Sequence, residues 1–150
     1  MAIASCLLDT NILLRISRRS DSHHKIIDTA LARLAEQGTM LCYTIQNIAE
    51  FWNAMTRPTS RNGLGLSVVE TDREVRAIEA GMILLPDNEM VYREWRRIVV
   101  KYGVCGVQVH DARLAAAMYI HGVSHILTLN AGDFARFDGL IAVHPDVVNL

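Results

Sequence analysis

The chain has 150 residues, of which 51% are hydrophobic and 21% are charged, as is typical of one globular domain. Fifteen Lys and Arg residues against sixteen Asp and Glu residues give a formal net charge of −1. This balance excludes a uniformly basic nucleic-acid coat and a disordered polyelectrolyte, but it is compatible with a local basic patch. We expect residues 1–150 to form a single domain.

The cysteines indicate neither a disulfide framework nor a zinc knuckle, because Cys6, Cys42 and Cys105 form no C-x-x-C pair. Cys6 and Cys42 lie in apolar runs, so we expect buried thiols and a reducing compartment. The first residues lack a basic start and Asp9 interrupts their apolar run, which argues against a signal peptide. No apolar run approaches the ~18 residues of a membrane span, so we expect a soluble, cytoplasmic protein.

Short apolar runs alternate along the chain with amphipathic stretches that carry helix caps. The first half is predicted to contain a strand at Ile3–Leu8, a helix from the cap Ser22 to Gly38, a strand at Thr39–Tyr43, a helix from Thr44 through Met55, and a helix from Ser67 to Gly81. The second half is predicted to contain a strand at Ile83–Leu85, a helix from the cap Asp87 to Gly103, a helix from Asp111 through Ile120, a strand at Ile126–Leu129, a helical turn after Asp133, and a strand at Leu140–Val143.

This alternation predicts an α/β fold, a three-layer α/β/α sandwich around a central, mainly parallel sheet of about five strands. In such sheets functional sites form at the carboxyl ends of the strands. One segment, Arg57–Gly65, is rich in turn residues. It is compatible either with a mobile flap or with a plain connection between helices.

Two aspartates lie where such a site is expected. Asp9 directly follows the first predicted strand, where it either serves chemistry or caps the next helix. Asp111 shares a helical stripe with the apolar residues Leu114, Ala115 and Met118. A carboxylate on a core-facing stripe is costly unless it is capped, paired or bound to a metal, and an N-cap role is equally compatible with the pattern.

Two further carboxylates are ambiguous when taken singly. Asp133 follows the fourth predicted strand and is compatible with a cap before Phe134. Glu50 lies inside a predicted helix and points away from the stripe expected to be buried, so alone it reads as a solvated side chain. That stripe consists of Ile45, Ile48, Ala49, Trp52 and Met55.

Taken together, Asp9, Asp111 and Asp133 each fall at an expected carboxyl-end position of the sheet. Clustered carboxylates repel one another, and some are forced to protonate unless a cation compensates them. Mg²⁺ and Mn²⁺ prefer oxygen ligands, and two such ions can support displacement at phosphorus without a Ser, Cys or His nucleophile.

Four segments in this order give the chain a resemblance to PIN-domain ribonucleases, most closely the VapC-like toxins of bacterial toxin–antitoxin pairs. The matching segments are Leu7-Leu8-Asp9-Thr10-Asn11, Ile48-Ala49-Glu50-Phe51, His110-Asp111-Ala112 and Leu127-Thr128-Leu129-Asn130-Ala131-Gly132-Asp133-Phe134. The resemblance spans nearly the whole domain, and the ordered set is more specific than any one segment.

The resemblance implies an acidic site that binds Mg²⁺ or Mn²⁺ and hydrolyses phosphodiester bonds in RNA. Its members would be Asp9, Glu50, Asp111 and Asp133, supported by the polar residues Thr10, Thr128 and Asn130. By the same analogy we expect a homodimer and a small antitoxin protein that blocks the cleft. His110 is not part of the family pattern, and we interpret Asp87 as a helix cap rather than a fifth ligand.

Basic residues follow the Asp9 segment and flank the turn-rich segment, and they form either an RNA-binding patch or a solvated surface. Aromatic residues make up 6% of the chain, so the sequence indicates no extended platform for stacking RNA bases. The candidate RNA contacts are Arg15, Arg18, Arg19, Arg57 and Arg61.

Two rival functions are compatible with parts of the pattern. One is a PIN-like module that binds RNA or protein without cutting, although such a module has no need of four carboxylates. The other is a phosphatase-like enzyme with Asp9 as covalent nucleophile, but Asn11 stands where that pattern has a second Asp.

Overall fold

The computed structural model describes residues 2–150 and contains a five-stranded sheet in the order β3-β2-β1-β4-β5. Each neighbouring pair of strands is parallel. The predicted α/β fold with a central parallel sheet is therefore confirmed. The strands are β1 (Ser5–Leu8), β2 (Met40–Thr44), β3 (Ile83–Leu85), β4 (His125–Leu127) and β5 (Ile141–Val143).

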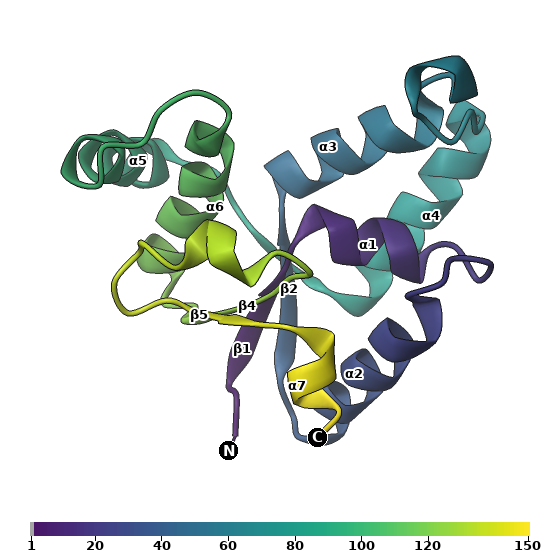
Figure 1. Ribbon diagram of the computed structural model, residues 1–150, viewed down its shortest axis with the longest axis horizontal. Coiled ribbons are helices and arrows are strands. Elements are labelled where there is room, and N and C mark those ends of the chain that lie inside the picture. Colours follow the sequence, from purple (N-terminus) through teal and green to yellow (C-terminus); the bar gives the residue numbers. More distant parts are fainter. Residues whose placement is uncertain (1) are drawn as a thin grey trace.

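Helices cover both faces of this sheet, as a parallel sheet requires. In Figure 1, α1 to α4 lie to one side of the strands, and α5 and α6 lie to the other. The helices are α1 (Thr10–Ile16), α2 (His24–Glu36), α3 (Ile45–Thr56), α4 (Val68–Gly81), α5 (Glu89–Lys101), α6 (Gln108–His121) and α7 (Pro145–Val148), with 3-10 turns η1 (Thr59–Arg61) and η2 (Ala131–Phe134).

The alternation of side chains along β1 divides the interior into two apolar cores. Leu7 packs into the core under α5 and α6, whereas Cys6 and Leu8 pack into the core under α1 to α4. Each fully buried leucine stabilises the fold by roughly 1.5–3 kcal/mol. Cys6 and Cys42 are buried, as predicted. The middle strand is thus locked from both sides, which fixes the position of Asp9 at its carboxyl end.

Two of the predicted helix caps are wrong by a residue or more. Helix α2 begins at His24 rather than after Ser22, because Asp21 Oδ1 accepts a hydrogen bond from the His23 N–H at 2.8 Å and prolongs the turn. Helix α5 is capped by Asn88 rather than by Asp87. The Asn88 side chain accepts from the Val91 N–H at 2.9 Å, the bond an N-cap makes.

The buried face of α3 also differs from the predicted stripe. Ile45 is 51% exposed, and the inward face instead carries Asn47, Phe51 and Met55, spaced four residues apart. The cause is the capping box at the start of the helix, in which Thr44 and Asn47 bond to each other's side chain and backbone. With these hydrogen bonds in place, the face of α3 that carries Ile45 and Ala49 is exposed.

The segment Arg57–Gly65 is tied closely to the end of α3. The N–H groups of Leu64 and Gly65 donate to the carbonyls of Ala54 and Arg57 at 3.0 and 2.9 Å. A Cβ at Gly63 would lie 2.0 Å from the Arg57 carbonyl oxygen, so this approach requires glycine. These bonds favour the interpretation as a connection over that as a flap. Within residues 2–150, no helix is long and apolar enough to span a membrane.

Candidate functional site

The candidate site lies at the carboxyl edge of the sheet, where three strands end in polar residues. Asp9 follows β1, Thr44 ends β2 and Thr128 follows β4. Strands β1 and β4 are parallel neighbours, and the Asp9 N–H continues their ladder to the Leu127 carbonyl at 3.0 Å. Figure 1 shows the beginnings of α1 and α3 beside this edge.

The Asp9 carboxylate is held by two hydrogen bonds. Oδ1 accepts from the Thr10 N–H at 2.8 Å, and Oδ2 accepts from the Thr128 hydroxyl at 2.8 Å. Asp9 is therefore the N-cap of α1 as well as a member of the site. Burial raises its pKa, the two bonds lower it, and repulsion from Glu50 and Asp133 raises it further.

The predicted supporting residues act in different ways. Thr128 is fully buried, and its oxygen also accepts from the Asn130 N–H at 3.0 Å, so Asn130 contributes its backbone. The Thr10 hydroxyl donates to Glu50 Oε1 at 3.0 Å and accepts from Asn47 Nδ2 at 3.1 Å. Thr10 therefore contacts Asp9 through its N–H and Glu50 through its hydroxyl.

Asp111 and Asp133 face the site from the other side of the sheet. Helix α6 begins at Gln108, so Asp111 lies inside its first turn and is not the N-cap. Asp133 lies within η2, whose N-cap is Asn130, so the cap interpretation is wrong here too. The residue before α6 is Val107, whose apolar side chain cannot cap the helix. The sequence therefore gives no signal for where α6 begins.

Asp111 is half-buried and lies on the same helical stripe as Leu114, Ala115 and Met118, which are buried as predicted. Burial raises its pKa from 3.8 to about 6, and repulsion from the three other site carboxylates contributes in the same direction. Arg136 offsets part of this shift. Among residues 2–150, none donates a hydrogen bond to the Asp111 carboxylate.

The donor chemistry of this cluster fits a hard divalent cation. All four predicted members are carboxylates. Burial raises the pKa of Asp9 and Asp111, and repulsion from Glu50 and Asp133 adds to this at both. In the described part of the chain, no three His, Cys, Asp or Glu side chains are gathered around a common point that would hold an ion. The side chains as they stand are thus not drawn together into a coordination shell, but their carboxylate oxygens and mutual repulsion are of the kind that Mg²⁺ or Mn²⁺ compensates.

The sequence analysis missed three polar residues that border the carboxylates. Asn47 is fully buried and bonds Thr10; its Thr-x-x-Asn spacing from Thr44 was the available signal. Asn11 Oδ1 accepts from the Leu129 N–H at 3.5 Å and ties α1 to the chain after β4. Arg136 is the cation that offsets the charge of Asp111, and nothing in the local sequence marks it.

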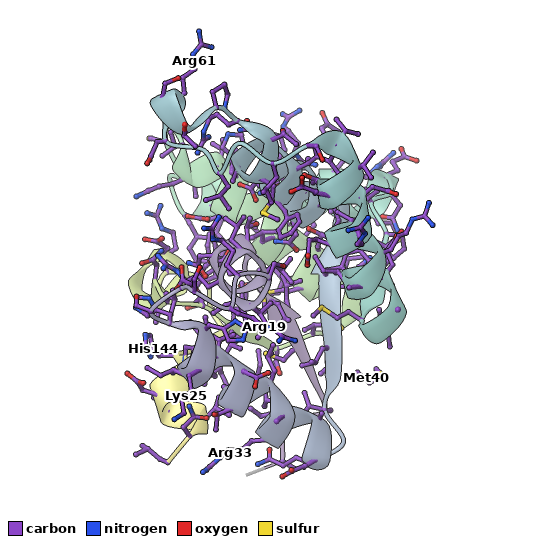
Figure 2. All side chains as sticks on the ribbon, turned by 90° about the vertical axis from the view of Figure 1, so that its right-hand side faces the viewer. Arg19, Lys25, Arg33, Met40, Arg61 and His144 are labelled. Carbon is purple, nitrogen blue, oxygen red and sulfur yellow. The ribbon has the colours of Figure 1, made fainter. Side chains whose placement is uncertain are left out.

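Only part of the predicted basic patch gathers at one place. Arg15, Arg18 and Arg57 line a pocket of about 550 Å³ that begins at Asn11. Asp21 lies in the same pocket and pairs with Arg15 at 3.1 Å. Two candidates do not line this pocket: Arg19 and Arg61 are exposed, and Figure 2 shows Arg61 at the outer tip of its loop.

The chain is similar in fold to solved toxin structures. VapBC2 of Rickettsia felis, bound to a DNA fragment from its promoter, aligns with a TM-score of 0.69 at 14% identity over 93% of this chain and 98% of that one. VapC20 of Mycobacterium tuberculosis, described as a toxin that cleaves the sarcin–ricin loop, gives 0.67 at 11% over 88% and 95%. FitAcB of Neisseria gonorrhoeae gives 0.64 at 21% over 93% and 97%.

At these identities the likeness is one of fold, and a comparison with curated proteins gives no match. The family model for the PIN domain, in contrast, matches residues 6–140 and so covers the site from Asp9 to Asp133. That span runs from within β1 to the residue before β5. The chain therefore belongs to the PIN domain family.

Proposed function

We propose that this protein is a metal-dependent endoribonuclease and the toxin of a toxin–antitoxin pair. One observation carries the proposal: carboxylates from separate elements lie close enough at the carboxyl edge of the sheet for their repulsion to add to burial in raising the pKa of Asp9 and Asp111. Uncompensated charge of this kind is costly unless a cation is bound. Membership of the PIN family and the likeness in fold to a toxin described as cleaving the sarcin–ricin loop support the same function.

In this proposal Asp9, Glu50, Asp111 and Asp133 hold Mg²⁺ or Mn²⁺. When bound, the cation supplies Lewis acidity for hydrolysis of the phosphodiester. The protein's own contribution is orientation. Thr10 aligns two carboxylates at once, with its N–H on Asp9 and its hydroxyl on Glu50. Such outer hydrogen bonds fix the direction of ligand oxygens.

The path of the RNA backbone is proposed to continue from the acidic edge along α1. Arg15 lies on this helix and Arg18 directly after it, and both line the same pocket as Arg57 at the end of α3. Cationic side chains beside a cleavage site hold the flanking phosphates of a nucleic acid. A local patch of this kind compensates for the overall charge of −1.

A small antitoxin protein is the proposed partner, because the neighbours in fold include toxin–antitoxin complexes. A homodimer and a cytoplasmic location belong to the same proposal. In it the antitoxin covers the acidic edge and keeps RNA from the carboxylates.

The test is cleavage of a structured RNA pool with Mn²⁺ or with EDTA. The variants are Asp9→Asn and, as a matched control, Asp28→Asn, which removes an exposed carboxylate on α2. We expect cleavage that requires Mn²⁺, is lost by more than about 100-fold in Asp9→Asn, and is retained in Asp28→Asn.

Full activity of Asp9→Asn would overturn the assignment of the site. A protein that does not cleave and whose thermal midpoint Mn²⁺ leaves unchanged would instead be a non-catalytic binding module, because a specific ligand raises the midpoint by mass action. Trapping of a phosphorylated Asp9 would indicate the phosphatase-like alternative.

A further inference from the structure

Two cavities separate from the arginine pocket share Arg113, and one of them reaches the acidic site at Glu50; together they are treated as one cleft with two parts. Its inner part, about 430 Å³, is lined by Glu50, Gln46 and Arg113 among others. Its outer part, about 480 Å³, is lined by Tyr92, Trp95 and again Arg113. Arg113 borders both cavities, of which one reaches Glu50 and the other reaches a pair of aromatic rings. We call this combined cavity the side cleft.

The aromatic end of the side cleft is held in place. The Trp95 indole N–H donates to the Val109 carbonyl at 2.9 Å, which ties α5 to the start of α6. The Tyr92 ring lies 6.3 Å from the Trp95 ring, centroid to centroid, and Tyr92 is 54% exposed. Exposed aromatic rings fixed beside a cationic side chain form a surface on which a flat, π-bonded ligand can stack.

Arg113 is positioned by a partner of its own. Its Nη2 pairs with Asp87 Oδ2 at 3.2 Å, and its side chain remains 42% exposed. This ion pair orients the guanidinium at the junction of the two cavities. A guanidinium plane stacks on bases as well as pairing with phosphates, which a lysine ammonium does not do.

The inner part of the side cleft contains an unsatisfied acceptor. Gln46 is 8% exposed, and its Nε2 donates to the His110 carbonyl at 2.8 Å. Its Oε1 has no hydrogen-bond partner among residues 2–150. Buried polar atoms are nearly always paired with protein or water, so an unpaired one on a residue that lines a cavity is a place where water or a ligand can donate. The amino and hydroxyl groups of a nucleotide are donors of this type.

We propose that the side cleft binds an unpaired nucleobase of the RNA, next to the bond that is cut. The base stacks on Tyr92 and Trp95 beside Arg113, and the nucleotide offers a donor to Gln46. Single-stranded RNA is commonly recognised by bases that leave the stack and lie on aromatic or arginine side chains. The inference rests on the proposed function for the identity of the ligand as RNA.

The proposed base site is local and is compatible with the prediction that the chain has no extended platform for stacking RNA bases. Trp95 is partly buried against the core under α5 and α6, and it also lines the cavity. Two aromatic residues three positions apart on α5 suffice for one base, even though aromatic residues are rare in the chain.

The test uses the fluorescence of Trp95. The chain has two tryptophans, so Trp52→Phe leaves Trp95 as the reporter, and Asp9→Asn in the same chain stops cleavage. A short single-stranded oligoribonucleotide is titrated with Mg²⁺ present. We expect quenching of Trp95, and an affinity about tenfold weaker when Tyr92→Ala is added. Tyr92→Phe keeps the ring and should keep the affinity.

Matched controls separate stacking from folding and from general charge. Met90→Ala removes an exposed side chain from the same helix, and Arg93→Gln removes an exposed cation there. Both should bind as the parent does, whereas Arg113→Gln should weaken binding. A series of oligonucleotides, each with one base removed, locates the bound base. For the oligonucleotide that lacks this base, Tyr92→Ala should not weaken the affinity further.

Several outcomes would overturn the proposal. They are an unchanged Trp95 signal at saturating RNA, the absence of RNA binding, and equal affinities of Tyr92→Ala and Met90→Ala. Loss of self-association in Tyr92→Ala with unchanged RNA affinity would assign the cleft to a second copy of the chain. RNA binding that depends on Tyr92 without any Mn²⁺-dependent cleavage would support the base site and contradict the proposed function, so the two failures are distinguishable.

Discussion

The two sides of the candidate site are built differently. On the β1 side, the Asp9 carboxylate accepts hydrogen bonds from Thr10 and Thr128, each at 2.8 Å. On the α6 side, no described residue donates to the Asp111 carboxylate, and Arg136 offsets its charge only in part. Burial is the first cause of a raised pKa on both sides. Only on the Asp9 side do hydrogen bonds act against it.

This difference shows which part of the site the fold itself secures. The donors to Asp9 come from the backbone of α1 and from a fully buried threonine, so that carboxylate is oriented before any ligand arrives. Preorganised ligands cost less to assemble when a cation or substrate binds. The Asp111 carboxylate accepts no such hydrogen bonds and is stabilised only by charges from elsewhere, such as that of Arg136. It is therefore the more easily protonated of the two.

The largest effect is expected at Thr128, which connects Asp9 to the chain after β4. Thr128→Val keeps the shape but removes the donor to Asp9 and the acceptor of the Asn130 N–H. We expect cleavage to fall by about 10- to 100-fold and the free energy of unfolding to fall by about 1–3 kcal/mol. Single-turnover cleavage and urea unfolding measure the two changes.

Thr39 provides the control for this change. It is also a buried threonine, and its hydroxyl donates to the Ile3 carbonyl at 2.6 Å, but it precedes β2 at the opposite edge of the sheet. Thr39→Val should lose similar stability without losing cleavage. If Thr128→Val cleaves at the parent rate, the hydrogen-bonded side does not orient Asp9 for the reaction.

A second prediction concerns Asn47, which connects the start of α3 to Thr10. Asn47→Ala removes the acceptor of the Thr44 N–H and the donor to Thr10 in a fully buried place. We expect a loss of about 2 kcal/mol in the free energy of unfolding. Ser67→Ala, which removes an ordinary exposed cap from α4, should lose only about 1 kcal/mol. Equal losses in urea unfolding would show that Asn47 is no more than a cap.

Asn47 also shows why part of the candidate site could not be predicted from the sequence. The rule that sites form at strand carboxyl ends locates Asp9 and Asp133, and the core-facing stripe of α6 locates Asp111. Glu50 was assigned to the site only through the family resemblance, because an exposed glutamate on a helix gives no signal of its own. Asn47 was missed for a different reason. It belongs to a polar capping box at the start of α3, and the apolar periodicity of a sequence gives no signal of such hydrogen bonds.

Contacts across the chain were equally hidden. Arg136 acts on Asp111, and Arg113 adjoins both parts of the side cleft, but neither lies in a motif. Their roles come from packing α5 and α6 against the sheet and from the placement of η2 beside them. A single sequence gives the element order but not these distances, whereas the parallel sheet followed from the alternation of apolar runs with amphipathic stretches.

The smallest predicted effect tests the comparison most directly, because a gain in stability is expected on one side of the site and not on the other. Asp111→Asn removes a charge that the fold does not stabilise, so the metal-free protein should gain about 1 kcal/mol at pH 7, after allowance for solvent screening. Asp9→Asn should give no such gain, because its new amide would face the Thr128 hydroxyl donor. Thermal unfolding in EDTA measures both.

The gain should also depend on pH. The pKa of Asp111 is about 6 in the folded protein and near its ordinary 3.8 when unfolded, so the ionised form destabilises the fold. The wild-type stability attributable to Asp111 is therefore lost as pH rises from about 4 to 6. Asp111→Asn should exceed the parent in stability above pH 6 and match it below pH 4. A gain that is constant across this range would show that packing, and not the unsupported charge, distinguishes the α6 side of the site.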